Sequence, residues 1–329
     1  MKLFILDPSG NSSLILDESN PWNHLVLEMK KVKQVHSPNE AQFFLINNLT
    51  SKSTKFAQRY CSPSNSALLM WESAVTCPRN FNTKLHKYFR LIFSPSPIWS
   101  LKVGAQTFDW PQNNPQIFDI TKNTNSSMRL NKWVMVQSKK FSFAKNELYF
   151  LRNELLNIQE EEELDLWGFG WEDITSKSLL KNFLNEKSLN FVKLFQDLKF
   201  NQKVPKNYKG SSSNKIQTMS NYRFSIVIEN SMDYVSEKLI DAVIAGTIPV
   251  YVGPHLEDFG IPHEIAVRSN PDVLDIRRAM REVVSDIQLQ ERILQAGFNF
   301  LNSKKFKSMI NVNVFKKLGK ILNERLIHE

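Results

Sequence analysis

The sequence is poor in the residues that build disulfide frameworks and metal sites. Only two of its 329 residues are cysteines, Cys61 and Cys77, and two cysteines make neither a disulfide framework nor a four-cysteine zinc site. We interpret both as packing residues in a reducing compartment. The six histidines show no HExxH or other paired spacing. The sequence therefore predicts no metal centre.

Long hydrophobic runs are also missing. No stretch approaches the ~20 apolar residues of a membrane span, and the apolar run 3–6 is too short for a signal peptide. We therefore expect the chain to stay in the cytoplasm. Apolar residues make up 42% and charged residues 23% of the sequence, which is typical of a globular protein. Its length favours two domains.

Acidic residues are outnumbered, because 42 Lys and Arg face 33 Asp and Glu and leave a net charge of +9. Such an excess favours an anionic partner: a phosphorylated small molecule, a nucleic acid or an acidic lipid surface. The basic residues are scattered and no RNA-recognition signature, zinc finger or arginine-rich arm is present, so we expect no nucleic-acid partner.

The C-terminal segment 301–329 is a basic amphipathic helix or tail. Phe315, Leu318, Leu322 and Leu326 repeat near one helical face, and lysines surround them. Two interpretations stay open. The helix either rests on the anionic inner face of a membrane or packs across two domains with its lysines in water. The lysines are Lys304, Lys305, Lys307, Lys316, Lys317 and Lys320.

Short apolar runs separated by helix-length connections predict parallel sheets with crossover helices. We expect strands at 3–6, 42–46 and 67–71 in the first half. The polar stretch 121–127 is a candidate linker. In the second half we expect strand 133–136, a helix over 146–156, and a strand that enters a glycine-containing turn over 164–171.

Residues 223–253 predict a compact βαβ unit, with strands at 223–228 and 248–253 and a helix over 235–246. Asp233 or Ser231 is placed to cap the helix, and Gly246 to end it. In open α/β sheets ligands bind beyond the carboxyl ends of the strands. The loop 229–238 would lie there.

The side chains of this loop suit a nucleoside diphosphate. A diphosphate requires cations and N–H donors, and ribose hydroxyls require a carboxylate acceptor. Glu237 and Lys238 supply one of each, and Asn230, Ser231 and Tyr234 add neutral polar groups. The alternative is that Glu237 is an ordinary first-turn acid favoured by the helix dipole.

The order of residues in this loop decides between these readings. Residues 222–231 read YRFSIVIENS, residues 233–238 read DYVSEK and residues 248–253 read IPVYVG. Together they resemble the signature of the α1,3/4-fucosyltransferase family. Looser resemblances are Tyr208-Lys209-Gly210, Lys215 and the turn at 165–168.

The resemblance implies an α/β fold of the GT-B glycosyltransferase type, with two Rossmann-like domains facing a cleft. The acceptor-side domain would span 1–130, the GDP-sugar donor-binding domain 131–300 and the basic tail 301–329. It implies inverting transfer of L-fucose from GDP-β-L-fucose to a hydroxyl of an acceptor oligosaccharide or polysaccharide. The expected acceptor is N-acetylglucosamine in a bacterial surface polysaccharide, with an α1,3 or α1,4 linkage.

Further site residues follow from the same resemblance. The family has a catalytic carboxylate after an apolar strand of its first domain, and Glu72 matches it within 70–74 (MWESA). The family's diphosphate-binding arginine falls at Lys145 here, and Arg152, about two turns further along the same face, is an alternative. The sequence has no Asp-x-Asp pair, of the kind that holds a metal in other nucleotide-sugar enzymes. We therefore expect no cofactor and no essential metal.

Two departures from the family keep alternatives open. Lys145 offers a point charge where arginine offers a fork, and the loop between Ser231 and Asp233 is two residues shorter than the family's usual one. The first alternative is a related transferase with another GDP-sugar as donor. The second is a nucleotide- or glycan-binding module without catalysis.

Overall fold

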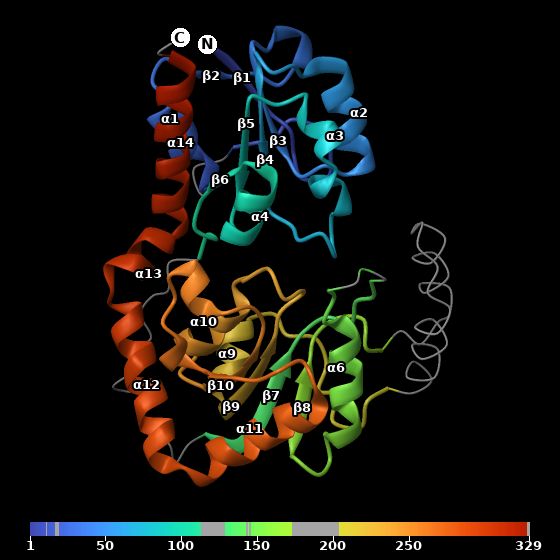
Figure 1. The fold of residues 1–329 in the computed structure, drawn as a ribbon, viewed down its shortest axis with the longest axis vertical. Helices are drawn as coiled ribbons and strands as arrows, with labels where there is room; N and C mark the ends of the chain where they lie inside the picture. Colours follow the sequence, from blue (N-terminus) through green and yellow to red (C-terminus); the bar gives the residue numbers. More distant parts are fainter. Residues whose placement is uncertain are drawn as a thin grey trace. The chain divides into compact units, whose positions relative to one another are not determined.

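The computed structural model describes residues 1–10, 12–16, 20–112, 129–142, 144, 146–172 and 204–327. The chain forms two compact units, each with one parallel sheet (Figure 1). Met1–Asn114 and Lys304–Glu329 make up unit 1, and Pro115–Ser303 makes up unit 2. The expected α/β class with two parallel sheets is confirmed. The predicted linker 121–127 lies outside the described residues.

The sheet of unit 1 has six parallel strands in the order β2-β1-β3-β4-β5-β6. After β1 the chain adds β2 on one side and β3 on the other, so the order of strand addition reverses between β1 and β3. The strands predicted at 3–6, 42–46 and 67–71 correspond to β1, β3 and β4. The bounds are Lys2–Ile5 for β1, Lys33–Gln34 for β2, Phe43–Asn47 for β3, Ser66–Leu69 for β4, Leu91–Ser94 for β5 and Gln106–Thr107 for β6.

Helices cover this sheet, and the last of them comes from the far end of the sequence. Helix α14 packs against α1 (Figure 1), and its Phe315, Leu318 and Leu322 are buried in the same core as Leu25 of α1. The bounds are Trp22–Glu28 for α1, Ser51–Tyr60 for α2, Thr83–His86 for α3, Pro97–Val103 for α4, Lys304–Met309 for α13 and Asn311–Ile327 for α14, with short 3-10 helices at Pro38–Glu40 and Pro78–Phe81.

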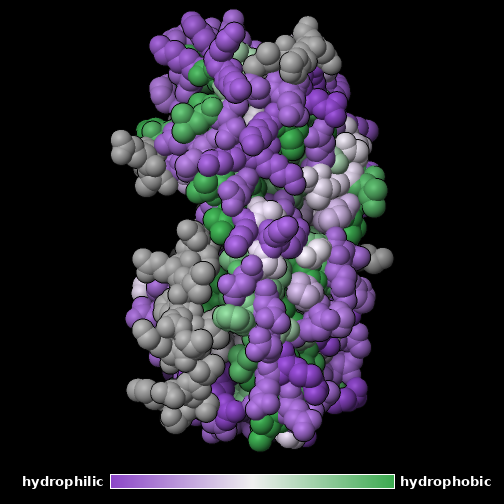
Figure 2. Space-filling model, turned by 90° about the vertical axis from the view of Figure 1, so that its left-hand side faces the viewer, coloured by the Kyte–Doolittle hydropathy of each residue, from purple (hydrophilic) through white to green (hydrophobic). Residues whose placement is uncertain are grey.

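The predicted domain division needs a correction at this point. Segment 301–329 was expected as a separate tail, whereas α13 and α14 belong to unit 1 and complete its core. The physical reason is the apolar stripe of α14, which unit 1 buries. The outward surface of these C-terminal helices is mainly hydrophilic (Figure 2). None of the helices in the described ranges is long and apolar enough to cross a bilayer.

The two cysteines both lie in unit 1. Cys61 and Cys77 are buried and form no disulfide. Burial raises the pKa of the Cys61 thiol to about 12 and that of Cys77 to about 11. Both thiols therefore stay protonated and act as small apolar side chains.

The sheet of unit 2 has five parallel strands in the order β11-β10-β9-β7-β8. Strand β9 is almost wholly buried, as expected for a parallel strand covered on both faces. Trp133 of β7 stacks on Phe224 of β9, with ring centroids 4.9 Å apart. The bounds are Leu130–Val136 for β7, Leu164–Trp167 for β8, Tyr222–Ile228 for β9, Ile248–Val252 for β10 and Val267–Arg268 for β11.

The two helices predicted in unit 2 are present at the expected places in the sequence, but both are shorter than predicted. Helix α10 begins at Lys238, later than expected, and Gly246 ends it in the left-handed conformation (φ +68°). The predicted N-cap residues, Asp233 or Ser231, are wrong. The residue at the N-cap is Glu237, and no side chain forms a capping hydrogen bond. The bounds are Tyr149–Leu155 for α6, Lys215–Ser220 for α9, Lys238–Ile244 for α10, Val273–Ser285 for α11 and Ile287–Leu301 for α12, with 3-10 helices at Leu156–Ile158, Leu256–Phe259 and His263–Ile265.

Candidate active site

The strand order of unit 2 selects one edge of its sheet. After β7 the chain adds β8 on one side and β9 on the other, so the carboxyl ends of β7 and β9 flank the crevice where such sheets bind ligands. The two strand ends are joined there. Gln137 Nε2 donates to the carbonyl of Ile228 at 3.0 Å, and Leu148 N donates to the carbonyl of Asn230 at 3.1 Å.

Glu229 organises the loop that follows β9. Its carboxylate is fully buried and accepts from Ser236 N at 3.0 Å and Ser236 Oγ at 2.7 Å. Lys238 Nζ lies 3.4 Å from the same carboxylate. Because Glu229 touches both ends of this connection, it fixes the start of α10 and the direction of the Lys238 ammonium. The sequence signal was present, since an acid directly after an apolar strand is buried only with partners, but we had assigned it no role.

Glu237 has two positively charged neighbours, Lys238 and Lys215. Lys215 Nζ lies 3.0 Å from its Oε1. Burial alone would raise the pKa of Glu237, but the ammonium groups of Lys238 and Lys215 outweigh burial and lower it to about 2. The carboxylate is therefore ionised at neutral pH. Its side chain keeps 35% of its surface exposed, so a ligand hydroxyl can reach it.

Asp241 lies one helical turn beyond Glu237. Burial and the neighbouring Glu237 charge raise its pKa to about 7, against the opposite effects of Lys215 and Lys238. Glu237 is therefore ionised at neutral pH, whereas Asp241 of α10 titrates near neutrality. The Lys238 side chain is 17% exposed.

Arg152 of α6 binds the backbone where β9 ends and this loop begins. Its side chain is buried, and Nη2 donates to the carbonyls of Ile228 at 2.9 Å and Glu229 at 2.8 Å and to Asn230 Oδ1 at 3.1 Å. Burial lowers the pKa of this guanidinium to about 10, although Tyr149 and the acids Glu229 and Glu147 act in the opposite direction. The guanidinium thus braces the backbone at the end of β9. Lys145 lies outside the described residues.

The three neutral residues predicted for this site are also mostly enclosed. Asn230, Ser231 and Tyr234 are buried, and Ser231 Oγ donates to Asp233 Oδ1 at 2.7 Å. This bond closes the short connection between Ser231 and Asp233. The loop therefore presents Glu237 and Lys238 to solvent and uses its other polar groups largely for its own shape.

The remaining predicted residue, Glu72, belongs to unit 1 and follows β4 at the carboxyl edge of its sheet. Its side chain is half-buried. Its backbone is held by Asn48, whose Oδ1 accepts from Trp71 N at 2.8 Å and Glu72 N at 3.0 Å. Asn80 Nδ2 donates to the same Oδ1 at 2.9 Å and to the carbonyl of Glu72 at 3.2 Å. Sequence reasoning missed these two asparagines, because nothing local indicates which strand ends their amides join.

Residues 160–163 form a run of four glutamates before β8. In the structure Glu162 pairs with Arg277 and Arg281 of α11, at 2.5 and 3.0 Å. These ion pairs join the acidic run to helix α11. The described residues contain no group of three or more His, Cys, Asp or Glu side chains that could hold a metal ion.

Comparison with known proteins gives these residues a context. Residues 180–284 match the model of glycosyltransferase family 10 (fucosyltransferase), C-terminal part. Residues 180–284 are thus similar to the C-terminal part of that family. The matched segment contains Glu229, Glu237 and Lys238, whereas Glu72 lies outside it.

Curated relatives from the fucosyltransferase family agree over short segments. The mouse 4-galactosyl-N-acetylglucosaminide 3-alpha-L-fucosyltransferase 9 is 37% identical over 73 residues, which are 17% of this chain and 20% of the relative. A putative fucosyltransferase-like protein of Arabidopsis thaliana is 26% identical over 103 residues, 30% of this chain and 20% of the relative. The chain thus spans about a fifth of the length of these relatives.

Solved structures match over nearly the whole chain. An alpha1,3-fucosyltransferase with GDP aligns with TM-score 0.55 and 14% identity, over 99% of this chain and 89% of the other. HepE of Anabaena in complex with UDP-glucose aligns with TM-score 0.59 and 12% identity, over 98% of this chain and 100% of the other. At these identities the likeness establishes the fold. The expected GT-B glycosyltransferase fold, shared by a fucosyltransferase, is therefore confirmed.

Proposed function

We propose that this chain is an inverting fucosyltransferase that moves L-fucose from GDP-β-L-fucose to a hydroxyl of an acceptor glycan. The observation that carries the proposal is the loop after β9, where Glu229 directs Lys238 and two lysines keep Glu237 ionised, inside the segment that matches the family. The expected acceptor is N-acetylglucosamine, with an α1,3 or α1,4 linkage. The name of the mouse relative, a 4-galactosyl-N-acetylglucosaminide 3-alpha-L-fucosyltransferase, supports that choice.

The donor would bind through opposite charges. The Lys238 ammonium would contact the diphosphate, and the resemblance to the family gives Lys145 the same role. The Glu237 carboxylate would accept hydrogen bonds from the ribose hydroxyls. Arg152 would contribute through the turn that it braces. Cations placed where charge develops on the leaving group lower the barrier without a metal, so we propose that no metal is required. Full activity after treatment with a chelator would agree with this.

The chemistry is a single displacement. The acceptor oxygen attacks the anomeric carbon of fucose while its proton passes to the Glu72 carboxylate. The bond between the anomeric carbon and the phosphate oxygen breaks, and GDP leaves with the electron pair, so the configuration inverts. One carboxylate base is enough, because stabilised GDP is a good leaving group.

Two variants test this assignment by separating binding from chemistry. Glu72→Gln is expected to lower fucose transfer by a factor of roughly 100 or more, since general bases contribute about 10²–10⁴-fold, with GDP affinity unchanged. Lys238→Ala is expected to weaken GDP binding about 10-fold, because a charge-assisted bond is lost. The measurements are calorimetry with GDP and mass spectrometry of products on a glycan array, with the exposed Glu40→Gln as control. Unchanged GDP affinity in Lys238→Ala would reject the donor site.

A related transferase with another GDP-sugar is the second candidate. It is favoured by the connection between Ser231 and Asp233, which is shorter than the family's and closed by their hydrogen bond. A panel of GDP-fucose, GDP-mannose and UDP-glucose separates the candidates, and turnover of a UDP-sugar but not of GDP-fucose would reject the first. GDP binding without turnover of any donor would instead indicate a non-catalytic binding module.

A further inference from the structure

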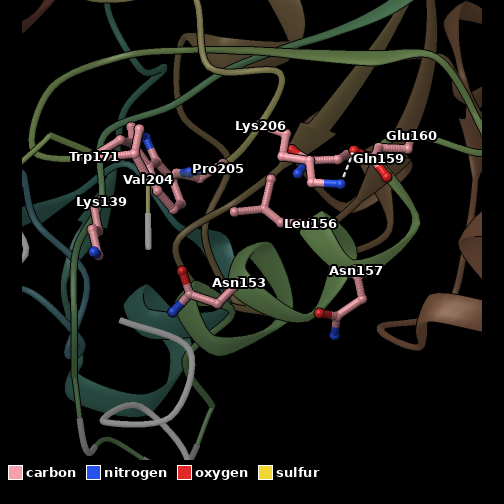
Figure 3. A pocket seen from close by; sticks show the side chains of 10 residues that line it. All are labelled: Lys139, Asn153, Leu156, Asn157, Gln159, Glu160, Trp171, Val204, Pro205 and Lys206. Carbon is pink, nitrogen blue, oxygen red and sulfur yellow. Dashed lines mark ion pairs between the residues drawn. The ribbon is translucent and has the colours of Figure 1, made fainter. Parts of the chain in front are cut away.

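Unit 2 contains a cavity of about 240 Å³. Figure 3 shows Asn153 of α6 and Leu156 of the following 3-10 helix on one side, and Trp171, Val204 and Pro205 on the other. Lys139, Asn157, Gln159, Glu160 and Lys206 complete the lining. None of the predicted site residues lines this cavity, so the loop 229–238 does not account for it.

Each of two buried amides in this lining has one atom without a hydrogen-bond partner in the part of the chain that the structure describes. Asn153 is 5% exposed, and its Nδ2 donates no hydrogen bond. Gln159 is 8% exposed, and its Oε1 accepts none. Buried polar groups are normally paired, and an unpaired one is unfavourable. One donor and one acceptor at the same cavity therefore point to a bound group that both accepts and donates.

Two of the three charged side chains around the cavity form an ion pair with each other. Lys206 Nζ lies 2.6 Å from Glu160 Oε1, a pair marked in Figure 3. Lys139 Nζ lies 5.8 Å from the centre of the Trp171 ring. A phosphate or carboxylate only accepts hydrogen bonds and would leave Gln159 Oε1 unpaired, whereas an ammonium only donates and would leave Asn153 Nδ2 unpaired. A hydroxyl does both.

The volume of the cavity limits the size of the ligand. Sites for drug-sized molecules have volumes of about 300–1,000 Å³, so 240 Å³ suits a smaller molecule, with room for one sugar ring. Apolar side chains beside a few placed amides are a common lining for such a ligand. We propose that this cavity binds one pyranose residue of a neutral glycan, with its hydroxyls paired to Asn153 and Gln159. This site is separate from the donor site and does not depend on the proposed function.

The test uses the full chain and methyl pyranosides of glucose, galactose, N-acetylglucosamine and fucose. At least one should bind saturably by ligand-observed NMR with Kd on the order of millimolar, as expected for so few ligand atoms. Asn153→Leu should weaken that binding about 10-fold or more. The variant should fold, because the amide that it removes makes no hydrogen bond through Nδ2. Asn299→Leu, an exposed amide on α12, is the matched control.

Two results would overturn the proposal. The first is no saturable binding of any of the four sugars, which would mean that water alone fills the cavity. The second is equal binding by wild type and Asn153→Leu, which would place the sugar elsewhere. GDP affinity, measured on the same samples, should be the same in both proteins. Absence of GDP binding in all of them would reject the proposed function and leave the sugar result standing.

Discussion

At the scale of single residues, Asp241 of α10 makes the stability of the protein depend on pH. The folded pKa of Asp241 is about 7, above its ordinary value of 3.8, so the folded protein keeps a proton that the unfolded chain has lost. The stability that Asp241 contributes is therefore complete below about pH 4 and is lost as the pH rises through about 7. Its cause is burial beside the permanently charged Glu237.

We predict that Asp241→Asn stabilises the protein at alkaline pH. The amide stays neutral, so the variant should gain on the order of 1–2 kcal/mol over wild type between pH 5 and pH 8, less than the full shift would give because the lysines rearrange. Urea unfolding at a series of pH values measures this. The exposed Asp258→Asn is the control, and parallel pH profiles for wild type and Asp241→Asn would contradict the prediction.

At the scale of elements, the end of β8 depends on one glycine. Gly168 has φ +138°, and a Cβ there would lie 2.1 Å from the carbonyl oxygen of Gln137 at the end of β7. Its N–H donates to the carbonyl of Gly210 at 2.9 Å. The turn therefore fits against the β7 strand end only without a side chain.

Gly168→Ala should cost about 3 kcal/mol of unfolding free energy, because steric overlap adds to an unfavourable backbone conformation. Gly104→Ala is the matched control. Gly104 also has positive φ but meets nothing within 4 Å, so only the backbone strain of about 1–2 kcal/mol remains. Equal losses for the two variants, measured by thermal unfolding, would show that contact with Gln137 is unimportant.

The elements also show what the sequence can predict. Strands β1, β3, β4, β7, β9 and β10 were found as apolar runs, because burial on both faces leaves such runs in the sequence. The start of α10 was not found. Local capping rules favoured Asp233 or Ser231, whereas the structure uses the carboxylate of Glu229 to hold Ser236 and Lys238. Contacts of this kind between separate segments, like those of Asn48 with Glu72, have no local sequence pattern.

At the scale of the whole molecule, the core of unit 1 requires a helix from the other end of the sequence. Leu318 of α14 is fully buried there. Leu318→Ala is expected to destabilise unit 1 by about 2–5 kcal/mol. Hydrogen exchange should become faster for amides of β1 and β3 but not for those of β7 and β9. The exposed Lys317→Ala should change neither set, and faster exchange in unit 2 would contradict independent cores.

The outward face of α14 carries the charge. Lys316, Lys317 and Lys320 are exposed, and we propose that in the cytoplasm this face contacts the anionic inner leaflet of a membrane. Changing all three to glutamine should weaken binding to phosphatidylserine vesicles by a factor on the order of 100, at about 1 kcal/mol per lysine. Co-sedimentation measures this, with Lys84→Gln as control. Equal binding to uncharged vesicles would remove the electrostatic explanation.

The return of α14 to unit 1 also sets an order of events during synthesis. Unit 2 is made of one continuous stretch, whereas unit 1 combines residues from both sides of it. Domains generally fold as units while the ribosome is still translating. The sheet that emerges first therefore waits, with the surface for Phe315 and Leu322 uncovered, until the later unit has left the exit tunnel. Glu72, proposed as the catalytic base, thus belongs to the unit that begins before unit 2 in the sequence and is completed after it.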